Sequence, residues 1–185
     1  WEDVQPGPGN PMPPRETYTL RDMHENSLKV LRTRKDIACV LINPLQALHL
    51  NQGAPGDSSL VDSSRRASYD REAYTTWLKK LRQVCTERNI VLIFDEVMTG
   101  FRVAKGGVQE LAGITPDLTA MGKVIGGGLP VGAFGGRAEI MDAAAIGSIG
   151  GTYIGSPICC VAASATIQYM KDINLNEKAV KVGKV

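Results

Sequence analysis

The pattern of apolar and polar positions predicts strands and helices in alternation. Residues 37–42 and 90–94 are almost continuously apolar, and each run predicts a strand buried on both faces of a parallel sheet. Between them, residues 69–88 carry apolar side chains at helical spacing, which predicts an amphipathic helix capped by Ser68 or Asp70. A strand, a helix and a second strand in this order are typical of an α/β protein.

Shorter elements are predicted in the rest of the chain. The helix predicted over residues 157–171 is rich in small residues, so we expect it to be closely packed. Gly- and Pro-rich stretches at residues 1–18 and 51–68 predict irregular structure, the second as a long loop. The further elements are helices over residues 24–36, 137–145 and 157–171, and a strand over residues 131–134.

Charge and composition restrict the classes of partner. The 21 Lys and Arg residues against 19 Asp and Glu give a net charge of +2, so we expect no nucleic-acid partner. No apolar run approaches the roughly 20 residues that span a bilayer, so we expect no membrane partner. The four cysteines form no obvious disulfide framework, which favours free thiols and a cytoplasmic location. With two histidines and no zinc-ligand spacing, no metal site is predicted.

A carboxylate follows the second apolar run directly. Asp95 would stand at the carboxyl end of a parallel strand, which is where ligands bind in open α/β sheets. It could instead cap the following turn or pair with Arg102. A magnesium site of a nucleotide triphosphatase would also place an aspartate here, but it requires a phosphate-binding loop. The Gly122-Lys123 pair is followed by Val124 rather than Ser or Thr, so that interpretation fails.

A buried carboxylate could also face the protonated nitrogen of a pyridoxal phosphate ring. Such a site needs a lysine whose amine attaches to the coenzyme aldehyde. Lys123 is the candidate, because Gly122 and Gly126 beside it would let a ring approach the backbone. Most lysines are solvated surface charges, and the apolar and glycine neighbours of Lys123 favour the functional interpretation without deciding it.

A series of motifs lies in residues 94–102, 106–110, 115–119 and 122–132, continued by residues 135–137 and 139–141. In their order and spacing, these motifs closely resemble those of the class III pyridoxal-phosphate-dependent aminotransferases. Within that family, the resemblance is strongest to glutamate-1-semialdehyde aminomutases and their relatives. It implies the α/β large domain of fold-type I enzymes, with a mixed, mostly parallel sheet and flanking helices.

The resemblance also implies roles for individual residues. Asp95 would pair with the pyridine nitrogen and Val97 would pack on one face of the ring. Lys123 would carry the internal aldimine and later move a proton. Thr152, after Gly151, stands where the family has a residue that reaches the coenzyme phosphate of the neighbouring subunit, so a homodimer is expected. An ordinary turn or cap hydroxyl is the alternative for Thr152.

The chain also departs from the family pattern. Asn43-Pro44 stands where the family usually has Glu-Pro, and residues 43–68 match the aminomutases poorly. The segment 44–46 is more similar to aminotransferase domains of polyketide–peptide megasynthases, which aminate a carrier-bound keto-acyl chain. The family's phosphate loop and small C-terminal domain find no counterpart. We therefore expect residues 1–185 to form the second half of the large pyridoxal-phosphate-binding domain, without the N-terminal phosphate-loop half.

The function expected of the complete protein is amino-group transfer between a small-molecule amine donor and a carbonyl acceptor. It would be an aminotransferase or an aminomutase, and an acceptor bound to a carrier protein is the alternative to glutamate-1-semialdehyde isomerisation. The other hypothesis is a non-catalytic fragment or pseudoenzyme domain. We expect the isolated chain to be inactive and to bind the coenzyme weakly.

Overall fold

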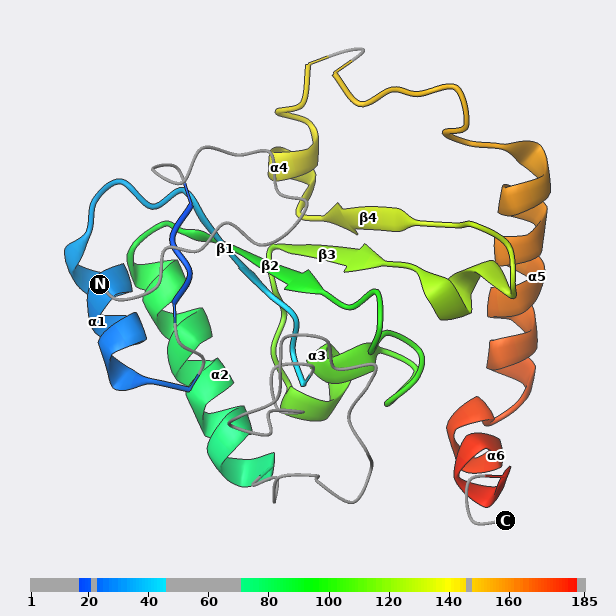
Figure 1. Cartoon of the computed structure of the whole chain (residues 1–185), viewed down its shortest axis with the longest axis horizontal. Helices are drawn as coiled ribbons and strands as arrows, with labels where there is room; N and C mark the ends of the chain where they lie inside the picture. Colours follow the sequence, from blue (N-terminus) through cyan, green and yellow to red (C-terminus); the bar gives the residue numbers. More distant parts are fainter. Residues whose placement is uncertain (1–16, 21–22, 46–70, 146–147, 183–185) are drawn as a thin grey trace.

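A four-stranded mixed sheet forms the centre of the fold in the computed structural model, which describes residues 17–20, 23–45, 71–145 and 148–182. The strand order is β1-β2-β3-β4 (Figure 1). β2 pairs in parallel with both β1 and β3, and β4 is antiparallel to β3. The strands are β1 (Cys39–Ile42), β2 (Val91–Asp95), β3 (Leu118–Met121) and β4 (Ala133–Gly136). The predicted mixed, mostly parallel sheet is confirmed.

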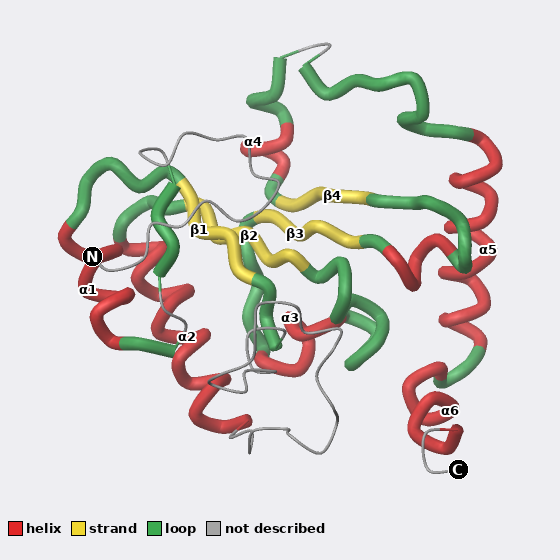
Figure 2. Tube along the Cα trace, in the orientation of Figure 1, coloured by secondary structure: helices red, strands yellow, loops and turns green. Residues whose placement is uncertain are grey.

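In the described residues, helices and one 3₁₀ turn flank the sheet (Figure 2). The predicted helices near residues 24–36, 69–88 and 157–171 are present, with slightly different limits. The helices are α1 (Glu25–Thr33), α2 (Arg71–Glu87), α3 (Gly107–Ala112), α4 (Ala138–Met141), α5 (Pro157–Asp172) and α6 (Leu175–Val182), and the 3₁₀ turn is η5 (Lys123–Gly126). The expected caps of α2, Ser68 and Asp70, and the irregular stretches at 1–16 and 51–68 lie outside the described residues.

The hydrophobic core lies between one face of the sheet and the helices α1, α2 and α3. The apolar stripe of α2 is buried in this core, where Tyr74 and Trp77 stack with ring centroids 6.4 Å apart. From the sheet, Leu92 and Phe94 of β2 enter the same core and are fully buried. Alternate residues of a strand point to opposite faces, so Val91, Ile93 and Asp95 face the other side.

The other face of the sheet is only partly covered. Leu41 of β1 is 64% exposed and Phe134 of β4 is 55% exposed. Burial in β1 and β2 therefore alternates along the strand, and the expectation that both strands are buried on both faces is wrong for this chain. The reason is that the described core packs on the face of Leu92 and Phe94.

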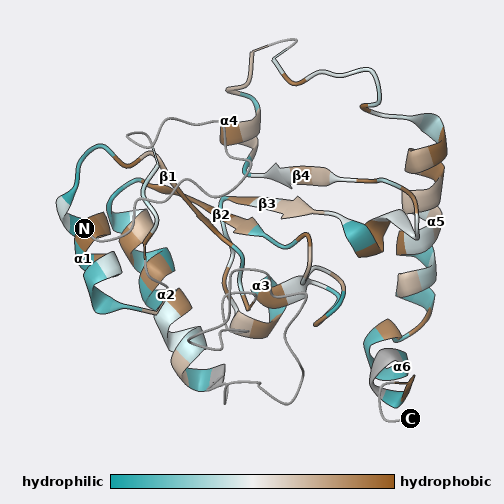
Figure 3. Ribbon diagram, in the orientation of Figure 1, coloured by the Kyte–Doolittle hydropathy of each residue, from teal (hydrophilic) through white to brown (hydrophobic). Residues whose placement is uncertain are grey.

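Two further expectations about helices are corrected. The helix predicted over 137–145 is confined to α4, because the chain leaves the helix at Asp142. Helix α5 has the predicted length, but Met170 is its one buried residue, so close packing around it is not seen. Figure 3 shows the most apolar positions of α5 in its first turns. None of the described helices is long and apolar enough to cross a membrane.

Candidate active site

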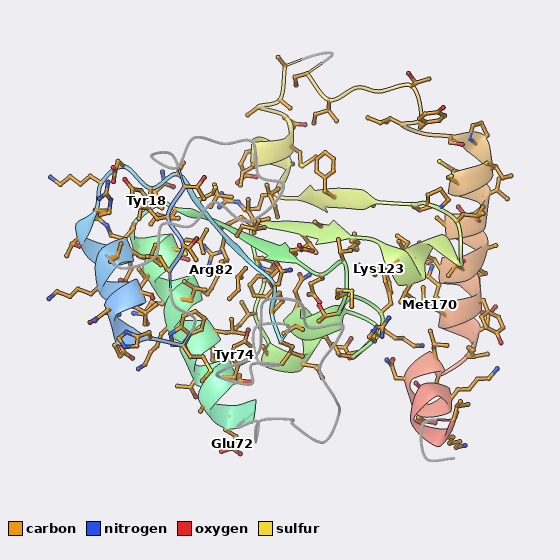
Figure 4. The ribbon with its side chains drawn as sticks, in the orientation of Figure 1. Tyr18, Glu72, Tyr74, Arg82, Lys123 and Met170 are labelled. Carbon is orange, nitrogen blue, oxygen red and sulfur yellow. The ribbon has the colours of Figure 1, made fainter. Side chains whose placement is uncertain are left out.

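Asp95 and Lys123 stand at the same edge of the sheet, at the ends of neighbouring parallel strands. Asp95 is the last residue of β2 and pairs in register with Ala120 of β3. β3 ends at Met121, and Lys123 follows after Gly122 as the first residue of η5. Lys123 is exposed and has a φ of 48°. Figure 4 shows it between the end of β3 and helix α5. The topology thus brings the two predicted residues together.

The carboxylate of Asp95 is half-buried and has one described hydrogen bond. Its Oδ1 accepts from the backbone N–H of Val97 at 3.0 Å, so the carboxylate does cap the turn that follows β2. Within residues 71–145 and 148–182, no ion pair joins Asp95 to Arg102. In the same part of the chain no bond engages Oδ2. That oxygen is therefore an acceptor available to a ligand that carries an N–H.

Val97 lies against the backbone that leads to Lys123. A Cβ placed on Gly122 would stand 3.2 Å from Cγ1 of Val97, closer than ordinary van der Waals contact. Only glycine at position 122 therefore allows this contact without a shift. The arrangement brings a carboxylate, an apolar side chain and a primary amine to two adjacent strand ends. These groups fit the ring nitrogen, ring face and aldehyde of pyridoxal phosphate.

Thr152 is not part of this group in the described chain. It is exposed and lies in the segment of turns that connects α4 to α5. Figure 1 shows that segment beyond β4, away from the ends of β2 and β3. The exposed turn agrees with either interpretation of Thr152, as a turn hydroxyl or as a group that reaches another subunit.

A second carboxylate beside Asp95 was not singled out by the sequence. Glu96 points to the covered face of the sheet and is 1% exposed. Its Oε2 accepts from Val108 N at 2.7 Å and from Thr99 Oγ1 at 3.0 Å. Its Oε1 accepts from Gln109 N at 3.2 Å and Gln109 Nε2 at 3.1 Å. Neighbouring carboxylates therefore have different surroundings: Asp95 has an open acceptor, whereas Glu96 is fully engaged by protein donors.

A buried ion-pair network stands at the opposite end of β3. Asp117, 5% exposed, accepts from Arg82 at 2.8 Å, from Arg137 at 3.0 Å and from the backbone N–H of Leu92 at 2.7 Å. Burial alone raises the pKa of Asp117, but these hydrogen bonds outweigh it and the pKa lies below the ordinary value of 3.8. Asp117 precedes β3 and Lys123 follows it, so this network is structural rather than part of the site.

A cavity in the described part of the chain lies apart from Asp95 and Lys123, and neither residue is among those that line it. This cavity of about 200 Å³ lies between the loop after β2 and the helices α5 and α6; its walls include Phe101, Lys105, Met170 and Leu175. No group of three His, Cys, Asp or Glu side chains suited to a metal ion occurs in the described part of the chain.

Comparison with known proteins gives consistent matches. The family model described as aminotransferase class-III matches residues 70–185. A glutamate-1-semialdehyde 2,1-aminomutase from Prosthecochloris aestuarii is 57% identical over 156 residues, which cover 83% of this chain and 32% of that protein. The chain thus spans about a third of the length of this curated relative.

Solved structures agree with these matches. An omega-transaminase from Sphaerobacter thermophilus has a TM-score of 0.61 and 35% identity, covering 80% of this chain and 31% of that one. The ornithine aminotransferase from Toxoplasma gondii has a TM-score of 0.69 and 25% identity, covering 89% of this chain and 35% of that one. The fold predicted from the sequence resemblance is confirmed by these structures.

Proposed function

The chain belongs to the class III aminotransferase family, and from this we propose that it forms part of a pyridoxal-phosphate-dependent enzyme that transfers an amino group. In this proposal residues 1–185 are the second half of the large coenzyme-binding domain. The phosphate-loop half and the small C-terminal domain belong to other parts of a longer protein. The one observation that carries the proposal is the placement of Asp95 and Lys123 at adjacent strand ends.

Asp95, Val97 and Lys123 hold the coenzyme in this proposal. Asp95 accepts a hydrogen bond from the protonated ring nitrogen through Oδ2, while Oδ1 stays fixed by Val97 N. The side chain of Val97, held against Gly122, packs on the ring face. Lys123 provides the amine that attaches the coenzyme and then carries a proton at Nζ during the reaction. When bound, pyridoxal phosphate supplies an electron-withdrawing ring and an aldehyde that accepts the amino group.

The substrates proposed are a small-molecule amine donor and a carbonyl acceptor. Isomerisation of glutamate-1-semialdehyde is favoured by the 57% identity to an aminomutase over 156 residues. Amination of a carrier-bound keto-acyl chain is the alternative, supported by the sequence at residues 44–46. Pro44 is fully buried just after β1, so this departure from the family pattern begins beside the end of β2 that carries Asp95.

We also propose a homodimer in the cytoplasm. The segment around Thr152 and the start of α5 exposes large apolar side chains, and Tyr153 is 88% exposed. Exposed apolar side chains gathered in one region are typical of a protein–protein interface. In such a dimer Thr152 reaches the coenzyme phosphate of the other subunit. The cytoplasmic location is supported by four cysteines that are all free in the structure.

The test uses the complete protein loaded with pyridoxal phosphate. Addition of an amine donor should abolish the visible band of the bound coenzyme, and addition of a carbonyl acceptor should restore it. Asp95→Asn should slow this cycle by about 10²- to 10³-fold, the loss expected when one preorganised electrostatic contact is removed. Asp142→Asn, at an exposed aspartate that ends α4, is the matched control. A cycle that runs at the same rate in Asp95→Asn as in the control would contradict the role of Asp95.

A further inference from the structure

We infer that the side chains of Glu96, Gln109 and Thr119 form a positioning bridge that sets the spacing between Asp95 and Lys123; the inference rests on the proposed function. The bridge lies under the sheet, on the covered face, while Asp95 faces the other side. None of its members would touch the coenzyme. They act through the strand ends to which they are attached.

The hydrogen bonds of the bridge run from β2 through α3 to β3. Gln109 Nε2 donates to Glu96 Oε1 at 3.1 Å and to Thr119 Oγ1 at 3.0 Å. A side-chain amide nitrogen has two hydrogens, so both bonds can form at once. Glu96 is the residue after Asp95, and Thr119 is the residue before Ala120, the register partner of Asp95. The bridge thus joins the two strands at the step where they carry the candidate site.

The carboxylate of Glu96 is held rigidly at the β2 end of the bridge. Besides Gln109, it accepts from Val108 N and from Thr99 Oγ1, and it is almost inaccessible to solvent. The backbone of Gly107 approaches the carboxylate closely on one side. Gly107 has a φ of 66°, and a Cβ there would lie 2.1 Å from Glu96 Oε2. Because these donors surround the carboxylate, a shift of Glu96 would leave several buried donors unpaired.

A second contact joins the same two strand ends. Val97 packs on Gly122 on the side of the site, one residue before Lys123. The bridge and this contact hold the two strand ends from opposite sides of the sheet. When the bridge is broken, β3 keeps its backbone pairing and the contact of Val97 with Gly122, but the hydrogen bonds on the covered face no longer tie Thr119 to Glu96. We therefore expect the lysine and the carboxylate to hold the coenzyme less rigidly.

The test uses Thr119 because its hydroxyl can be removed with little change of shape. In the complete protein loaded with coenzyme, Thr119→Val should speed coenzyme release by about two- to tenfold, the effect of losing one neutral hydrogen bond. The visible circular dichroism of the bound coenzyme should weaken as well. Thr119→Ser retains the hydroxyl and should behave as the unmodified protein. Thr86→Val, which removes a hydroxyl bonded to Arg82 on α2, is the matched control for the loss of a threonine.

Gln109→Met provides a second variant on the same bridge. It should accelerate release at least as much as Thr119→Val, and the double variant should release the coenzyme no faster than Gln109→Met alone, because both changes break one bridge. Release and circular dichroism unchanged in both single variants would overturn the inference while leaving the proposed function intact. Failure of the unmodified protein to carry the coenzyme on Lys123 would instead overturn the proposed function, and the inference with it.

Discussion

Replacement of Asp117 by asparagine tests how much the buried ion-pair network around Asp117 stabilises the fold. The carboxylate joins α2, β2, β3 and the start of α4 through Arg82, Leu92 and Arg137. Asparagine can still accept from Leu92 N, but it loses the charge that faces the two guanidinium groups. The bond to Arg82, whose side chain is 20% exposed, contributes about 1.5–3 kcal/mol. The bond to Arg137, 54% exposed, contributes at most about 1 kcal/mol because water screens it.

Asp117→Asn should therefore lower the free energy of unfolding by about 2–4 kcal/mol, measured by urea unfolding at pH 7. Asp36→Asn, which removes an exposed ion pair with Arg34, should change it by less than about 1 kcal/mol. A loss in Asp117→Asn no larger than in this control would refute the reasoning.

The pH dependence of that loss provides an independent check. The pKa of Asp117 is lowered in the folded chain, so its stabilising contribution is complete above the ordinary value of 3.8 and is lost as the pH falls through the lowered value. The difference between the unmodified protein and Asp117→Asn should thus be constant from pH 8 to about pH 5 and shrink only below about pH 4. A difference that already declines near pH 6 would point to another group.

Two further predictions concern backbone conformation and thiol reactivity. Gly107→Ala should destabilise the fold by about 2–4 kcal/mol in urea unfolding, because it combines a left-handed φ with a clash against Glu96. Gly113→Ala is the control: its φ is 62° and no atom lies within 4 Å of the new Cβ, so it should cost about 1–2 kcal/mol. Equal losses in the two variants would contradict the clash with Glu96. Burial raises the pKa of the Cys85 thiol to about 11. Alkylation at pH 8 should therefore label the exposed Cys39 and Cys160 and leave Cys85 unmodified until the chain unfolds. Labelling of Cys85 in the folded chain would contradict its burial.

The sequence alone predicted the parts of the fold that depend on local periodicity. Helix α2 and strand β2 follow from the spacing of apolar residues, and the strand end at Asp95 follows from β2. Burial of β1 and β2 on both faces, which their apolar runs predicted, is wrong for this chain, because covering of the second face depends on residues distant in sequence. Helix α3 was missed for a similar reason: its first N–H groups are bonded by Glu96, which precedes Val108 by 12 residues.

The candidate site was only partly predictable, because local sequence indicates its residues but not which of them lie close together. Asp95 and Lys123 could be selected because each follows an apolar or glycine-lined segment, but their proximity depends on the register between β2 and β3. Glu96 gave no signal of its own, since a second acidic residue after a strand is equally typical of a solvated turn. The contact of α6 with the loop after β2 was also beyond local patterns, because Asn176 Nδ2 donates to Arg102 O across 74 positions.

The most direct test of the central claim is to locate the attachment point of the coenzyme. The complete protein is saturated with pyridoxal phosphate, reduced with borohydride, digested and examined by mass spectrometry. We expect the label on Lys123, and we expect Lys123→Arg to carry none, whereas Lys105→Arg, at an exposed lysine in the loop after β2, should be labelled as the unmodified protein is. A label on another lysine, or no label in the saturated protein, would contradict the assignment of Lys123 and with it the proposed amino-group transfer at this edge of the sheet.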